Sequence, residues 1–89
     1  MHNDEKNFCR VCGYNLGYPI WGEDGETPSY EICPCCGVQF GYGDTSLENC
    51  IDIRKHWIEN EKCKWFSPKL KPQDWDLRAQ LEKIPEDFK

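Results

Sequence analysis

The chain has 89 residues, seven of which are cysteines, and a formal net charge of −5. A chain of this length cannot build two separate stable cores, so residues 1–89 are expected to form a single domain. The negative charge disfavours non-specific binding to nucleic acid, and no apolar run is long enough to span a membrane.

The amino-terminal residues 1–7 are polar and partly acidic. A secretory signal would instead begin with a basic stretch and continue with an apolar one. We therefore expect a cytoplasmic protein, whose thiols stay reduced and whose Cys-x-x-Cys pairs bind metal more often than they form disulfides. The odd number of cysteines also fits disulfide pairing poorly.

Two Cys-x-x-Cys-Gly segments lie in the first half of the chain, and we call residues 9–13 the first knuckle and residues 33–37 the second knuckle. Such a turn can direct two sulfurs at one ion, and the glycine that ends it tolerates a positive φ. The spacing between the two pairs is typical of zinc sites. The predicted metal ligands are the thiolates of Cys9, Cys12, Cys33 and Cys36.

Three further cysteines lie outside this ligand set. Cys35 lies within the second knuckle, but a frame with two residues between the ligands leaves it out and predicts a spare residue of the turn. A redox-sensing thiol and a ligand swap to Cys35 are the alternatives. Cys50 is expected in the core. A second metal site that joins His56 and Cys63 to Cys35 or Cys50 matches no common ligand pattern.

Between the knuckles, residues 18–32 are rich in turn residues and predict a short hairpin or an irregular loop. After the second knuckle, Val38, Phe40 and Tyr42 alternate with a polar residue and a glycine. This period of two predicts a short, half-buried strand over residues 38–42.

Two helices are predicted in the second half of the chain. The first runs from about Ser46 to Asn60, with Thr45 and Glu48 forming a capping box. The second begins near Pro72 and ends before Pro85. The side chains predicted to share one face of the first helix are Leu47, Cys50, Ile51, Arg54, Trp57 and Ile58.

The knuckle sequences Cys9-Arg10-Val11-Cys12-Gly13-Tyr14 and Cys33-Pro34-Cys35-Cys36-Gly37 resemble the paired knuckles of zinc ribbons and rubredoxins. The Cys-Pro-Cys-Cys run is also similar to small bacterial cysteine-rich CPCC proteins. The first resemblance implies a small α+β fold, with a zinc-ribbon or rubredoxin-like β half over residues 8–44 and a helical extension over residues 45–89. It implies either a structural zinc ion or a single iron ion that transfers electrons, and four sulfurs suit both metals.

Four thiolates close the coordination shell of a metal, whereas a catalytic zinc ion keeps one position open. The sequence contains no phosphate-binding loop and no recognisable Ser-His-Asp or Cys-His arrangement. We therefore expect that the protein is not an enzyme. The first hypothesis is a small structural-zinc protein that acts as a protein-interaction or regulatory module, with another protein as its partner.

Two alternative functions remain open. One is a rubredoxin-like iron carrier for electron transfer. The other is nucleic-acid binding through the loop Lys62–Lys71, where four lysines surround two aromatic residues that could stack on bases. The aromatic residues predicted to contact a partner are Trp21, Trp65 and Phe66.

Overall fold

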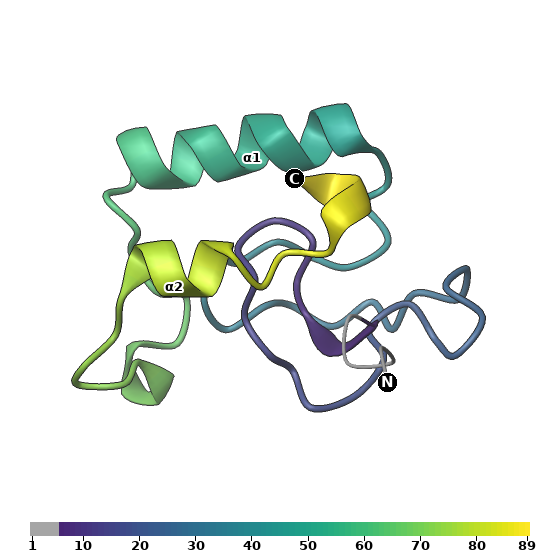
Figure 1. Cartoon of the computed structure of the whole chain (residues 1–89), viewed down its shortest axis with the longest axis horizontal. Helices are drawn as coiled ribbons and strands as arrows, with labels where there is room; N and C mark the ends of the chain where they lie inside the picture. The colour runs from purple at the N-terminus through teal and green to yellow at the C-terminus, as the bar shows by residue number, and fades with distance from the viewer. Residues whose placement is uncertain (1–5) are drawn as a thin grey trace.

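The structure is a computed structural model that describes residues 6–89. Within residues 8–89 its helices are α1 (Leu47–Glu59), the 3-10 helix η2 (Pro68–Leu70), α2 (Leu77–Leu81) and the 3-10 helix η3 (Glu86–Phe88). All four lie in the second half of the chain, while turns and loops dominate the first half (Figure 1). Part of the polar segment 1–7 lies outside the described residues.

The predicted β half was wrong. Residues 6–89 contain no β-strand and no sheet, so neither a zinc-ribbon nor a rubredoxin-like β half is present, and the α+β class does not apply. Two isolated antiparallel bridges remain, Phe8 with Asn15 and Ile32 with Gln39. Each bridge flanks one knuckle, so the backbone pairing expected of a strand ends after a single residue pair.

The strand predicted over residues 38–42 fails because the chain turns there. Val38 and Phe40 are buried, as the alternation predicted, but the next residue, Gly41, has a φ of +97°. The amide groups of Tyr42 and Gly43 both donate to the carbonyl of Gln39. These turn hydrogen bonds use the groups that a neighbouring strand would need.

Helix α1 begins one residue later than predicted. Its N-cap is Ser46, whose hydroxyl accepts a hydrogen bond from the Asn49 amide at 3.1 Å, so the capping box with Thr45 does not form. Cys50 and Trp57 are buried, but Leu47 and Ile51 are exposed. The buried face of α1 is therefore rotated away from the one predicted.

Helix α2 is shorter than the predicted second helix, which was expected to begin near Pro72. Asp76 caps α2 from an extended conformation by accepting from the Arg78 amide at 3.1 Å. Residues 71–76 are not helical, and the ring of Trp75 packs edge to face against the rings of Trp57 and Trp65. Trp75 therefore packs against other tryptophans from the non-helical segment that precedes α2.

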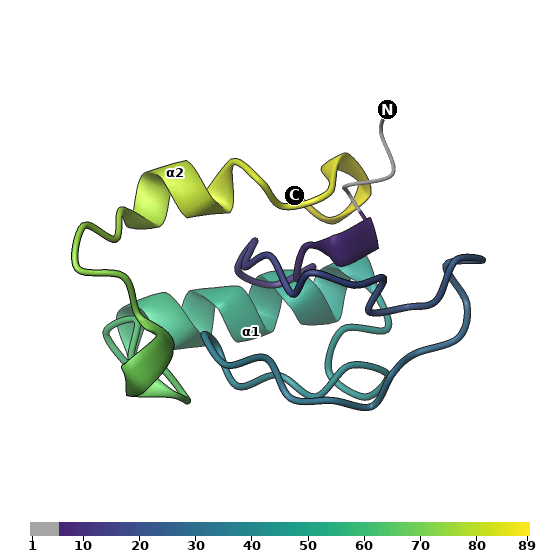
Figure 2. The ribbon, with the colours of Figure 1, turned by 90° about the horizontal axis from the view of Figure 1, so that it is seen from below.

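One buried cluster joins the two halves of the chain, because it contains cysteines of both knuckles together with Phe40, Trp57 and Trp65. The segment that carries the first knuckle lies between α1 and α2 in two views at right angles (Figures 1 and 2). Within the described residues, we find no helix with the length and apolar character that crossing a bilayer requires.

Candidate metal centre

The structure brings together the sulfurs of Cys9, Cys12, Cys33 and Cys36, all within 4.8 Å of one another. The pairs Cys9–Cys36 and Cys12–Cys33 are both separated by 3.7 Å. Sulfurs about 2.3 Å from a tetrahedral zinc ion would lie about 3.8 Å from one another. A disulfide needs about 2.05 Å, so these cysteines are free thiols. The cluster therefore fits a zinc-ribbon-like metal site, although the surrounding fold is not a zinc ribbon.

The two knuckles have the same backbone structure. In each, the carbonyl of the first cysteine accepts from the amide of the final glycine, and the amide of that cysteine donates to the carbonyl of the residue after the glycine. The glycine has a positive φ, +85° at Gly13 and +82° at Gly37. The matching bonds are Cys9 N–H to Tyr14 O, Gly13 N–H to Cys9 O, Cys33 N–H to Val38 O and Gly37 N–H to Cys33 O. This repeated turn explains why each pair of sulfurs points to a common centre.

Arg54 of α1 attaches the first knuckle to the helical half. Its Nε donates to the carbonyl of Val11 at 2.6 Å, and its Nη2 donates to the carbonyl of Arg10 at 3.0 Å. The same Nη2 donates to the carbonyl of Phe88 in η3 at 2.5 Å. One guanidinium group thus holds the first knuckle and the end of the described chain against α1.

Gln80 of α2 covers the other side of the first knuckle. Its side-chain Nε2 donates to the carbonyl of Cys12 at 3.1 Å, and its Oε1 accepts from the indole N–H of Trp75 at 2.8 Å. Its main-chain carbonyl lies so close to Gly13 that a Cβ on that glycine would be 2.1 Å from the oxygen. The first knuckle therefore needs this glycine for contact with α2 as well as for its φ.

The second knuckle is covered by the loop between the helices. The amide of Phe66 donates to the carbonyl of Cys35 at 3.1 Å, and the amide of Ser67 donates to the carbonyl of Pro34 at 2.8 Å. The Phe66 side chain lies in van der Waals contact with the position a Cβ on Gly37 would occupy. Both knuckles are thus fixed from the helical half.

The four clustered sulfurs are largely shielded from water, and burial disfavours a negative charge that no nearby cation compensates. Cys9, Cys12 and Cys33 are fully buried and Cys36 is partly buried. Burial raises the pKa of Cys12 and Cys36, whereas hydrogen bonds from the thiols of Cys12 and Cys36 lower the pKa of Cys33. Burial thus opposes the charged form of Cys12 and Cys36, and a divalent cation would compensate the charge of four thiolates.

Cys35 is excluded from the cluster by its contact with α2. It is fully buried, and its sulfur accepts a hydrogen bond from Gln80 Nε2 at 3.2 Å. This burial argues against the redox-sensing role, which needs an accessible thiol. Cys50 is buried on α1, so its predicted place in the core is confirmed, and burial raises its pKa to about 12.

Residues 6–89 contain no second group of metal-ligating side chains around His56 and Cys63. His56 instead lies 3.4 Å from the carboxylate of Glu61 and contacts the amide of Asn60. Cys63 is partly buried at the end of the turn after α1, where its amide donates to the carbonyl of Trp57.

Asp44 is a buried polar residue that the sequence analysis did not select. Its Oδ2 accepts from the indole N–H of Trp21 at 2.8 Å, and its Oδ1 accepts from the amide of Gly41 at 2.8 Å. The guanidinium of Arg10 lies between the rings of Trp21 and Phe88, 4.3 Å and 4.2 Å from their centres. Trp21 is therefore engaged inside the molecule, which weakens its predicted role as a partner contact.

The other predicted partner contacts differ in exposure. Trp65 is 3% exposed and packs edge to face against Tyr14 and Trp75, so its predicted contact with a partner was wrong. Phe66 is 59% exposed, as a partner contact requires. Tyr30 and Tyr42, which the sequence analysis did not select, are exposed as well, at 54% and 66%.

Comparison with known proteins identifies similar chains in Bacillus subtilis strain 168. The protein YozI is 38% identical, over 58% of this chain and 56% of its own length. The protein YoaQ is 33% identical, over 58% of this chain and 57% of its own length. Both are described as uncharacterized, and this chain spans little more than half of either. No family model and no solved structure matches the chain.

Proposed function

We propose that this is a structural-zinc protein, in which the thiolates of Cys9, Cys12, Cys33 and Cys36 bind one zinc ion and the folded surface acts as a protein-interaction or regulatory module. The observation that carries the proposal is the clustering of the four sulfurs within 4.8 Å of one another, contributed by two turns with matching backbone hydrogen bonds. A bound zinc ion would cross-link the two knuckles. Within the described residues, no strand and no disulfide provides such a link.

The size of the chain supports a structural role for the metal. A small domain buries too little apolar surface for a wide stability margin. Binding of zinc by cysteine and histidine ligands contributes about 10–16 kcal/mol in zinc-finger peptides at neutral pH, which is enough to decide whether such a chain folds. The ligands are tied to α1 and α2 through Arg54 and Gln80, so metal binding would stabilise the helical half as well.

The closed ligand set supports a role other than catalysis. Four protein ligands leave no coordination position for water or substrate. Three of the four cysteines are fully buried, so a substrate would have little access to the ion. We therefore propose that the protein acts through its surface and not at the metal.

Nucleic-acid binding through Lys62–Lys71 receives less support. Trp65, one of the two aromatic residues that were to stack on bases, is buried in the core. Lys71 lies over the ring of Trp75, 5.1 Å from its centre, and so contacts the protein itself. Phe66 alone remains of the aromatic pair that the hypothesis required.

Metal analysis of the purified full chain tests the proposal. We expect one equivalent of zinc, and we expect that a strong chelator abolishes the near-ultraviolet circular dichroism of the tryptophans. One equivalent of iron with reversible reduction would replace zinc by the electron-carrier alternative. A chain that is folded, metal-free and unaffected by zinc would contradict the proposal.

A further inference from the structure

We propose that the exposed rings of Tyr30 and Tyr42, together with the carboxylates of Glu26 and Glu31, form a docking surface for an arginine-bearing segment of another protein. The inference rests on the proposed function, since it gives the chemistry of the partner that the interaction module would bind. We call these four residues the tyrosine–acid surface.

The backbone at Tyr30 gives the first reason. Its φ is +63°, a left-handed conformation that is costly for a bulky side chain and that glycine adopts freely. Strained residues of this kind persist where the surroundings or the function require them. The strain here does not serve burial, because the Tyr30 side chain is about half exposed.

The strained conformation places the two tyrosines together. The Tyr30 ring lies 5.6 Å from the Tyr42 ring, centre to centre, and its edge would be 2.8 Å from a Cβ on Gly41. The carbonyl of Tyr30 accepts a hydrogen bond from the side chain of Gln39 at 3.1 Å, which fixes the backbone. Two adjacent exposed aromatic faces are a favourable site for a planar guanidinium group.

The charge of the surrounding chain gives the second reason. Between Arg10 and Arg54 the sequence contains seven acids and no lysine, arginine or histidine. Both arginines are engaged inside the molecule, Arg10 between two rings and Arg54 on main-chain carbonyls. A tetrathiolate zinc site would add about two further negative charges.

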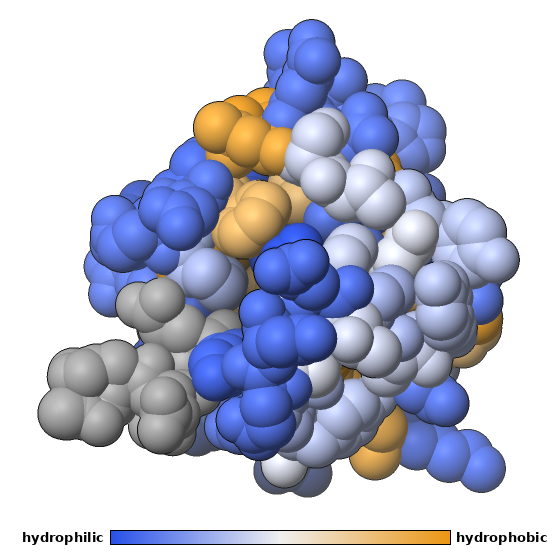
Figure 3. All heavy atoms as spheres, turned by 90° about the vertical axis from the view of Figure 1, so that its right-hand side faces the viewer, coloured by the Kyte–Doolittle hydropathy of each residue, from blue (hydrophilic) through white to orange (hydrophobic). Residues whose placement is uncertain are grey.

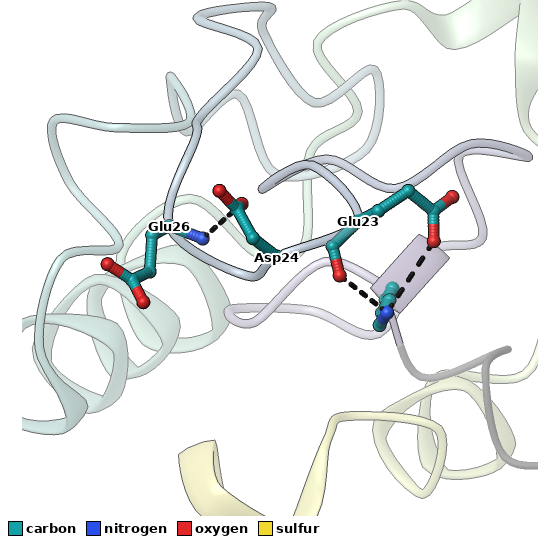
Figure 4. A network of polar contacts seen from close by, with 4 residues as sticks. Glu23, Asp24 and Glu26 are labelled. Atoms are coloured by element: carbon teal, nitrogen blue, oxygen red, sulfur yellow. Dashed lines mark hydrogen bonds and ion pairs between the residues drawn. The ribbon is translucent and has the colours of Figure 1, made fainter.

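The loop before Tyr30 carries part of this charge, and it closes on itself because the Thr27 amide donates to the carbonyl of Trp21 at 2.9 Å. Glu23 of this loop pairs with Lys6 at 3.5 Å, while Asp24 accepts from the Glu26 amide (Figure 4). Among the described residues, no cation lies within ion-pair distance of Glu26 or Glu31. These two carboxylates are therefore available to a cationic partner.

The side of the molecule on which the loop before Tyr30 projects also favours a polar, charged partner over an apolar one. The space-filling view from the side on which the loop projects is mainly hydrophilic, with small and separate apolar patches (Figure 3). An apolar partner would require a larger continuous patch. Exposed aromatic rings on an acidic stretch of chain instead match arginine, through stacking and hydrogen-bonded charge pairs.

Fluorescence anisotropy with the zinc-loaded full chain tests the proposal. The probe is a short labelled peptide of alternating arginine and leucine, and its control has glutamine in place of each arginine. We expect the arginine peptide to bind, more weakly at about 0.15 M salt than at low salt. Equal binding of the glutamine peptide, or tighter binding of a single-stranded oligonucleotide, would overturn the proposal.

Variants of the surface separate this proposal from general attraction to an acidic protein. We expect Tyr42→Ser to weaken binding by about fivefold or more and Glu31→Gln by about twofold, while Tyr18→Ser and Glu59→Gln leave it within about twofold. Tyr18 and Glu59 are exposed residues of the same types outside the surface. Equal effects of Tyr42→Ser and Tyr18→Ser would contradict a specific site.

Tyr30→Gly separates binding from folding. Glycine suits the positive φ, so we expect the melting temperature to be unchanged or higher while peptide binding falls. Unchanged binding would exclude Tyr30 from the site and overturn the proposal. Zinc content is measured for each variant: a zinc-loaded chain that binds no peptide contradicts the docking surface alone, whereas a folded metal-free chain that binds it contradicts the zinc centre alone.

Discussion

The side-chain amide of Gln80 reaches the carbonyl of Cys12 across 68 residues of sequence, and the same residue places its own main-chain carbonyl over Gly13. Helix α2 is thus in direct contact with the first knuckle, which carries two of the four clustered sulfurs. Substitutions at this contact should affect the stability of the candidate metal centre although they remove none of its cysteines.

The first prediction concerns Gly13. Gly13→Ala should lower the free energy of unfolding by about 3 kcal/mol or more, because an alanine there has an unfavourable φ and its Cβ would overlap the Gln80 carbonyl. Gly17 has nearly the same φ, +84°, but no atom within 4 Å of its Cβ position. Gly17→Ala should therefore cost about 1 kcal/mol. Chemical denaturation of the zinc-loaded variants measures both, and equal costs would mean that the α2 contact contributes nothing.

The second prediction decides the ligand frame of the second knuckle. Cys36→Ser should lose the bound metal and unfold the chain, since it removes one of the four clustered sulfurs. Cys35→Ser should keep one equivalent of zinc at a cost of about 1 kcal/mol, because its sulfur lies outside the set of four mutually close sulfurs and accepts from Gln80. Metal analysis and native mass spectrometry give the result. Loss of metal from Cys35→Ser with retention in Cys36→Ser would reverse the assignment.

A third prediction follows from the contacts of Arg54. Arg54→Lys keeps the charge but cannot reproduce the planar set of donors to the carbonyls of Val11, Arg10 and Phe88. We expect a loss of about 1–3 kcal/mol in the free energy of unfolding and faster release of zinc to a chelator. Arg78→Lys is the control, because Arg78 is exposed on α2. Identical stability of the two variants would show that Arg54 is not a structural contact.

The fourth prediction is a pH dependence that arises at Cys50. Burial raises the pKa of this thiol from 9.0 to about 12. Above pH 9 the unfolded chain therefore loses this proton before the folded chain does, and unfolding becomes more favourable as the pH rises. The free energy of unfolding should fall by about 1.4 kcal/mol per pH unit between pH 9 and pH 12 through this group.

Cys50→Ala provides the comparison, because it removes the titrating thiol at the expense of a small cavity. Its unfolding free energy, measured by urea denaturation at several alkaline pH values, should depend less steeply on pH than that of the original chain. Parallel curves for the two proteins would mean that Cys50 does not titrate differently in the folded state.

In the helical half, the sequence pattern predicted the bounds of α1 better than it predicted which face of α1 is buried. The period of apolar residues placed α1 correctly to within a residue or two, because helix hydrogen bonds are local. It wrongly put Leu47 and Ile51 on the buried face, since the face that packs is chosen by neighbours such as the first knuckle. Trp65 was misjudged for the same reason, because its burial depends on Tyr14 and Trp75.

By itself, the sequence determined which turns bring sulfurs together, because the spacing Cys-x-x-Cys-Gly and its hydrogen bonds lie within a few residues. It could not show that these turns form without flanking β-strands. It also could not show that the Cys35 sulfur accepts a hydrogen bond from Gln80, or that the Asp44 carboxylate accepts one from Trp21. Those features join residues far apart in the chain, and only the tertiary structure decides which distant donors satisfy which buried acceptors.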